Sequence, residues 1–244
     1  MKNKRKLLYI TIIITIIILL LASIFYSYIN NYYKADTNIK EYLKSSNNVK
    51  VSKNNNYYYF DGKSEDKAII FYPGGKVEYT AYAPILHKLS ENGIDCFLIK
   101  MPFNLAILNK NAADSIIKKY KYKYWYLAGH SLGGVAASTY THDNKDKVSG
   151  LILLASYPNK TIDNKTKLLS IYGTNDGVLD LEKYKQSKKY WSKKNKEFII
   201  YGANHSGFGN YGHQSGDKKA LITNEQQQQE TIDFIINRIG DVFK

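Results

Sequence analysis

The segment Gly129-His130-Ser131-Leu132-Gly133 limits the possible folds more than any other part of this chain. It follows an apolar, aromatic run at 124–128 that is typical of a buried strand, and a helix-like stretch at 134–140 comes after it. A serine between two glycines at such a junction is typical of a nucleophile elbow, a tight turn that holds the serine hydroxyl clear of the backbone. A side chain at either glycine would collide as the strand and the helix close together, and the turn strains the serine backbone. The segment therefore predicts an α/β fold with Ser131 as an activated nucleophile.

The rest of the chain alternates between apolar runs and helix-like segments. Strands are expected at 49–53, 57–60, 68–72, 96–100, 124–128, 150–155, 167–172 and 198–201, and helices at 79–92, 112–120, 179–193 and 226–239. The first two strands flank an asparagine-rich turn and predict a hairpin. Continuous apolar strands separated by helices predict a mostly parallel sheet with helices on both faces.

An apolar stretch without charged residues, Leu7–Ile29, precedes this pattern and predicts a membrane anchor. As a helix it would reach about 34 Å, enough to cross a hydrocarbon core of about 30 Å. It is longer than the apolar region of a cleavable signal peptide and has no convincing cleavage site. The basic residues of the tail 1–6 predict a cytoplasmic N-terminus. We therefore expect a single-pass protein of the cell membrane, with a juxtamembrane linker at 30–48 and an extracytoplasmic hydrolase-type domain at 49–244.

The net charge of +14 is consistent with a domain that works near an anionic membrane or wall surface. Lysine and tyrosine alternate at 118–124, but no nucleic-acid module surrounds this segment, so we interpret it as a helix end that runs into a strand. We expect neither a nucleic-acid partner nor an obligate protein partner. The single cysteine, Cys96, excludes an internal disulfide. No cluster of histidine, cysteine or carboxylate residues has metal-ligand spacing, so no metal or other cofactor is predicted.

A serine hydroxyl becomes reactive when a histidine takes its proton and a carboxylate orients that histidine. In this type of fold the acid and then the histidine follow the nucleophile along the chain, each on a loop after a later strand. Asp176 follows the strand at 167–172, and His205 follows the strand at 198–201. The carboxyl ends of parallel strands meet at one edge of the sheet, where active sites form. The order therefore predicts a triad of Ser131, Asp176 and His205.

One alternative stays open for each of the two later roles. Asp180 lies close to Asp176 and is an alternative acid. His213 comes eight residues after His205 on the same loop and is an alternative base.

The reaction also needs N–H donors for the negative charge that develops on the substrate oxygen. The helix that begins at Leu132 offers one backbone N–H. A second is expected from the loop after the strand at 68–72, where Gly75 is the first candidate and Lys76 the second. Apolar side chains at the same edge suggest a substrate rim that includes Lys76, Phe103 and Leu105.

Five sequence blocks together resemble the compact bacterial branch of the α/β-hydrolase superfamily, often called the fold-5 or dienelactone-hydrolase-like group. The blocks are Phe-Tyr-Pro-Gly-Gly-Lys-Val at 71–77, Met-Pro-Phe-Asn-Leu-Ala at 101–106, Gly-His-Ser-Leu-Gly-Gly at 129–134, Gly-Thr-Asn-Asp-Gly at 173–177 and Asn-His-Ser-Gly-Phe-Gly at 204–209. The resemblance implies Ser131 as nucleophile, Asp176 as acid and His205 as base, in agreement with the reasoning from the residues. Dienelactone hydrolases proper use a cysteine nucleophile, so their lactone substrate is not implied.

Only 11 residues separate the strand that ends at Ala155 from the one that begins at Lys167, which leaves no room for a lid domain. Taken together, these features predict a membrane-anchored serine hydrolase that cleaves a small-molecule, lipid or wall ester through an acyl-enzyme. An acyltransferase would use the same three residues. Outside the enzymes, the alternative is a catalytically silent surface-binding module.

Overall fold

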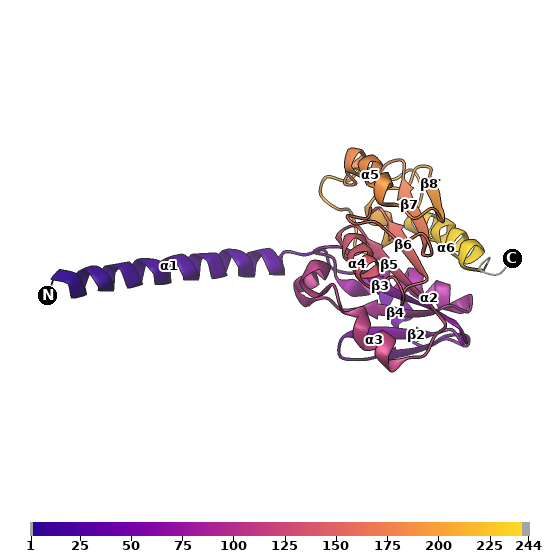
Figure 1. The fold of residues 1–244 in the computed structure, drawn as a ribbon, viewed down its shortest axis with the longest axis horizontal. Helices are drawn as coiled ribbons and strands as arrows, with labels where there is room; N and C mark the ends of the chain where they lie inside the picture. Colours follow the sequence, from indigo (N-terminus) through magenta and orange to yellow (C-terminus); the bar gives the residue numbers. More distant parts are fainter. Residues whose placement is uncertain (1, 241–244) are drawn as a thin grey trace. The chain divides into compact units, whose positions relative to one another are not determined.

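The computed structural model describes residues 2–240, and the chain divides into two compact units at Tyr32. The first unit is a single helix, α1 (Lys2–Asn30), drawn in indigo in Figure 1. Its segment Asn3–Asn30 is long and apolar enough to cross a membrane, and a signal sequence has the same character. The second unit begins at Tyr33 and holds the rest of the fold.

An eight-stranded sheet forms the centre of the second unit, with the strand order β1-β2-β4-β3-β5-β6-β7-β8. The strands are β1 (Lys50–Lys53), β2 (Tyr57–Asp61), β3 (Lys67–Tyr72), β4 (Asp95–Ile99), β5 (Tyr124–His130), β6 (Gly150–Leu154), β7 (Lys167–Gly173) and β8 (Asn195–Ile200). The strands β3 to β8 are parallel, whereas β1 and β2 form an antiparallel hairpin that pairs with β4. The predicted mostly parallel sheet and its hairpin are confirmed.

Helices cover both faces of this sheet (Figure 1). One apolar core contains side chains from α2 (Ala83–Glu91) and α6 (Asn224–Gly240), and the other contains side chains from α3 (Ala113–Lys119) and α4 (Leu132–Asp143). The remaining helical segments are α5 (Leu181–Ser187) and the short 3-10 turns η1 (Thr37–Leu43), η2 (Tyr79–Tyr82), η3 (Pro102–Asn104), η4 (Ala106–Asn109), η5 (Lys188–Tyr190) and η6 (Ser206–Phe208). Ile39 of η1 is buried, so the chain already packs on the core before β1.

Two predicted helices are shorter than the sequence pattern suggested. The helix expected at 79–92 is divided into η2 and α2, with Pro84 in the first turn of α2, where its missing N–H costs no hydrogen bond. The helix expected at 179–193 begins only after Asp180, whose carboxylate accepts the N–H of Lys183 and caps α5.

Candidate active site

Ser131 occupies the turn between β5 and α4 in a strained conformation, with φ 51° and ψ −124°. A Cβ on Gly129 would lie 2.6 Å from the backbone of Gly133, and a Cβ on Gly133 would lie 2.2 Å from the carbonyl oxygen of Tyr72. The first contact is the predicted strand-to-helix collision. The second involves the end of the neighbouring strand β3, which the local sequence pattern did not indicate.

Backbone strain gathers at the carboxyl edge of the sheet. Among the described residues, six non-glycine residues have positive φ, and five of them lie in the segments that follow β3, β4, β5 or β6: Lys76, Phe103, Asn104, Ser131 and Ala155. Such conformations cost on the order of 1–3 kcal/mol each and persist where the surrounding structure holds them in place, as it does around functional sites. This edge is therefore the natural place to look for chemistry.

His205 and Asp176 form a buried pair at this edge. The His205 Nδ1 lies 2.9 Å from Asp176 Oδ2 and 3.2 Å from Oδ1, and both side chains are only 1% exposed. Since a carboxylate only accepts hydrogen bonds, Nδ1 is the donor in this pair, and in the neutral ring Nε2 is the nitrogen that has the lone pair. Within residues 2–240, the buried Nε2 has no hydrogen-bond partner. A histidine in this state has a nitrogen that is free to take a proton.

The Asp176 carboxylate is itself fixed by the turn that follows β7. Its Oδ1 accepts the backbone N–H groups of Val178 and Leu179, at 2.8 and 2.7 Å. Asp176 therefore organises its own loop and orients His205 at the same time.

Ser131 and His205 line the same apolar pocket, which has a volume of about 200 Å³. Its other walls come from α4 and from the loops after β6 and β7: Leu132, Val135, Ala155, Ser156, Tyr157, Val178, Leu179 and Asp180. The structure thus brings together the predicted nucleophile and base, with the predicted acid behind the base.

The two alternatives are placed less favourably. Asp180 also lines the pocket, but its carboxylate accepts the N–H of Lys183 and pairs with the Lys183 ammonium. His213 is exposed and does not line the pocket.

The predicted N–H donors lie next to each other. A Cβ on Gly75 would be 2.9 Å from Leu132 Cδ2, so the loop after β3 touches the start of α4. The N–H of Lys76 donates to the carbonyl oxygen of Asn104 and is therefore occupied, which favours Gly75 over Lys76 as the second donor. For the part of the chain that the structure describes, the hydrogen bonds involve neither the Gly75 N–H nor the Leu132 N–H.

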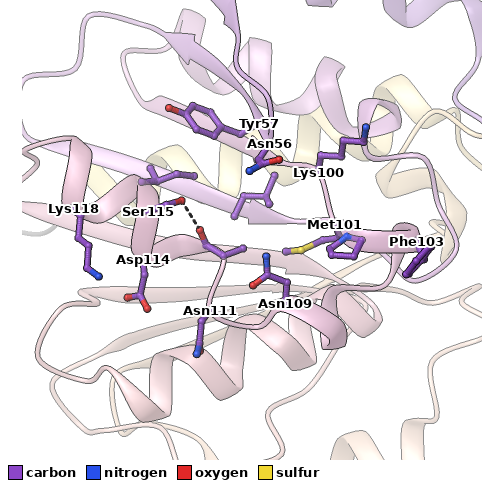
Figure 2. A pocket seen from close by; sticks show the side chains of 14 residues that line it. Asn56, Tyr57, Lys100, Met101, Phe103, Asn109, Asn111, Asp114, Ser115 and Lys118 are labelled. Carbon is purple, nitrogen blue, oxygen red and sulfur yellow. Dashed lines mark hydrogen bonds between the residues drawn. The ribbon is translucent and has the colours of Figure 1, made fainter.

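The predicted rim residues do not line the Ser131 pocket. Leu105 is buried, and Phe103, half exposed, lines a second hollow of about 770 Å³. Figure 2 shows this larger hollow, with Phe103 and Met101 at one end and Asp114 and Lys118 at the other. It contains neither Ser131 nor His205, so size alone does not identify the reactive site.

Asp217 supports the loops that carry Asp176 and His205, and the sequence pattern did not indicate this role. Its carboxylate accepts the N–H groups of Gly177, His205 and Ser206 at 3.0, 3.2 and 2.8 Å, and the Ser206 hydroxyl at 3.0 Å. Burial by itself would raise the pKa of this carboxyl, but the hydrogen bonds outweigh burial and hold the pKa below its ordinary value. Asp217 thus stays charged while it joins the loop after Asp176 to the loop of His205.

His130, the second residue of the elbow, makes another link. Its Nδ1 accepts the Tyr82 hydroxyl at 2.8 Å, and its Nε2 donates to the His205 carbonyl oxygen at 3.1 Å. The Tyr82 hydroxyl in turn accepts the N–H of Gly74 at 3.2 Å. Burial, followed by the proximity of His205, lowers the pKa of His130 well below its ordinary value, so the ring is neutral and can accept and donate in this way.

Comparisons with known proteins agree with this fold. A family model described as "Alpha/beta hydrolase family" matches residues 68–229. No curated protein matches the sequence.

Three solved structures illustrate the likeness of the fold. Alpha/beta hydrolase domain-containing protein 10 from mouse is 14% identical, with a TM-score of 0.61. The match covers 82% of this chain and 100% of the mouse chain. Est1E from Butyrivibrio proteoclasticus is 16% identical, with a TM-score of 0.54 and coverage of 80% and 100%. The Paleococcus ferrophilus monoacylglycerol lipase is 14% identical, with a TM-score of 0.54 and coverage of 77% and 99%.

Proposed function

This chain belongs to the alpha/beta hydrolase family, and we propose that it is a serine hydrolase that cleaves carboxylic esters through Ser131, His205 and Asp176. Family membership and neighbours that include an esterase and a monoacylglycerol lipase support hydrolase chemistry. The observation that carries the finer assignment is the buried His205, in the pocket that Ser131 lines. Asp176 holds its Nδ1, while its Nε2 has no hydrogen-bond partner among the residues that the structure describes.

The proposed reaction begins when His205 Nε2 takes the proton from Ser131 Oγ. The oxygen attacks the ester carbonyl carbon, and Asp176 stabilises the imidazolium that forms. The N–H groups of Leu132 and Gly75 hold the negative charge on the carbonyl oxygen. Collapse of this intermediate breaks the bond to the alcohol, which leaves with the proton from Nε2.

Water completes the turnover in the second half of the reaction. Nε2 takes a proton from the water as it attacks the acyl carbon. The bond between this carbon and Ser131 Oγ then breaks, Nε2 gives the proton to Oγ, and the acid is released. His205 returns to its starting state, so no external acid or base is consumed.

A fluorophosphonate probe tests this assignment on the full chain in detergent. The probe reacts only with a serine whose proton can be removed, so a covalent adduct is expected on Ser131, located by mass spectrometry of the labelled peptide. A wild-type chain that does not react would contradict the proposal and favour a silent binding module.

Asp217 is expected to position the loops that carry Asp176 and His205. Replacing it by alanine removes the acceptor shared by Gly177, His205 and Ser206, so we expect kcat to fall about 10- to 100-fold while KM changes little. Steady-state kinetics with a p-nitrophenyl ester measures this split. Asp146→Ala, an exposed aspartate outside the site, is the matched control and should leave both constants unchanged. A rise in KM that accompanies the fall in kcat, or an equal loss of kcat in Asp217→Ala and Asp146→Ala, would contradict a positioning role for Asp217.

We further propose that the catalytic domain lies outside the cytoplasm and is anchored by α1. The length and apolar composition of α1 and the basic residues before its apolar stretch support this topology. Protease added to intact cells is therefore expected to degrade the domain, while an epitope tag on the N-terminus remains protected. Protection of the domain itself would reverse the orientation, and release of the domain without α1 would indicate a cleaved signal sequence.

A further inference from the structure

We propose that the Ser131 pocket is an acyl site that accepts only short chains, up to about six carbons in total. This inference rests on the proposed function, because it assigns the group that stays bound to Ser131 after the alcohol has left.

The pocket is small for a ligand site. Its volume of about 200 Å³ is below the range of about 300–1,000 Å³ that holds drug-sized ligands. An apolar cavity of about 150 Å³ holds one benzene, so about 25 Å³ suffices for each heavy atom. By that measure the pocket holds about eight heavy atoms. Three of these belong to the ester group itself, which leaves room for about five further carbons.

The walls suit a hydrocarbon chain. Leu132 and Val135 come from α4, Ala155 follows β6, and Val178 and Leu179 follow β7. Burial of a methylene among apolar side chains is favourable, so each carbon that fits between these side chains should improve binding. The acyl group gains most from such an environment because it remains on Ser131 through both halves of the reaction. The alcohol has to be protonated by His205 and then leave for solvent.

The wall of the pocket that Val178 and Leu179 form is hydrogen-bonded to the catalytic groups. The backbone N–H groups of Val178 and Leu179 donate to the carboxylate of Asp176, and the Ser156 hydroxyl donates to the Ser131 carbonyl at 2.7 Å. Leu179 is only 9% exposed, so its side chain is packed rather than free to swing away. If this wall moved outward for a longer chain, it would disturb the carboxylate that orients His205. The position of this wall is therefore fixed by the same contacts that build the site.

The test is a series of p-nitrophenyl esters from acetate to decanoate, measured on the full chain in detergent below the micelle-forming concentration of each ester. We expect kcat/KM to rise to butyrate or hexanoate and then to fall at least about tenfold by decanoate. Leu179→Ala removes three carbons from the wall, so the fall should move to chains about two to three carbons longer. Leu181→Ala, the same substitution on an exposed leucine outside the pocket, should keep the wild-type profile.

Fluorophosphonate labelling of each variant separates the two levels of the inference. A labelled wild-type enzyme that prefers decanoate, or a Leu179→Ala profile that does not move while labelling is normal, overturns the acyl site and leaves the serine hydrolase intact. Preference for acetates of long alcohols over methyl esters of long acids supports the acyl assignment, and the opposite preference overturns it. A wild-type chain that is neither labelled nor active removes the proposed function and this inference together.

Discussion

Replacing Ser131 by alanine is expected to lower kcat/KM for a p-nitrophenyl ester by about 10⁴-fold or more and to abolish fluorophosphonate labelling. Ser131 is the hydroxyl that the elbow holds in a strained conformation beside His205, and alanine leaves nothing for His205 to deprotonate. The folded state should survive, because the Ser131 contacts that the structure records are made by its backbone: its N–H donates to Leu154 and its carbonyl accepts from Ser156. Thermal unfolding of both proteins checks this second expectation.

Ser115→Ala is the matched control for this loss. Ser115 lines the larger hollow of Figure 2, where its hydroxyl donates to the carbonyl oxygen of Ala112. If the larger hollow carried the chemistry, this variant would lose activity and Ser131→Ala would retain it. Unchanged activity in Ser115→Ala, together with loss in Ser131→Ala, assigns the reaction to the smaller pocket.

Much of the fold could be predicted from the sequence because its signals are local. The strands β3 to β7 are buried on both faces and read as continuous apolar runs, and each is separated from the next by a helix or a polar loop. The proposed triad could also be predicted, because strand ends and chain order place Ser131, Asp176 and His205 at one edge. Its geometry agrees with the expectation, while its catalytic role stays a prediction.

The remaining features depend on contacts between distant parts of the chain. Asp217 lies 40 residues from Gly177, and Tyr82 lies 48 residues from His130, so no local pattern indicates either hydrogen bond. Two of the three predicted rim residues, Phe103 and Leu105, lie on the loop after β4, whose apolar side chains suggest contact with substrate; the third, Lys76, lies on the loop after β3. In the structure the loop after β4 buries Leu105 and turns Phe103 toward another hollow. Apolar residues in a loop indicate packing as readily as binding, and only the fold separates the two.

These hydrogen bonds between distant parts of the chain connect the loops that form the site. Asp217 joins the loops after β7 and β8, while His130 joins the His205 loop to Tyr82 and, through its hydroxyl, to the glycine loop after β3. Both sets of hydrogen bonds involve the backbone of His205. Its N–H donates to the Asp217 carboxylate, and its carbonyl oxygen accepts from His130 Nε2. The backbone of the proposed base is therefore held from both sides while its Nε2 has no hydrogen-bond partner within residues 2–240. Such preorganisation is what general base catalysis requires.

His205→Ala is expected to lower kcat by about 10⁴- to 10⁶-fold, whereas His213→Ala should retain wild-type kcat. The two histidines share one loop, but His205 is buried against Asp176 and His213 is exposed outside the pocket. Initial rates with one ester at saturation measure both variants under identical conditions. The reverse pattern would transfer the role of base to His213 and would require the loop to rearrange in solution.

The double variant Ser131→Ala/His205→Ala tests whether the two residues act as one unit. If His205 acts only by taking the proton of Ser131, its removal costs nothing further once the hydroxyl has gone, so the double variant should be no slower than Ser131→Ala alone. Losses that multiply would mean that the two residues act independently, for example with His205 activating water directly. Residues that act as one unit give non-additive losses, and that outcome is the kinetic signature expected of the pair that lines this pocket.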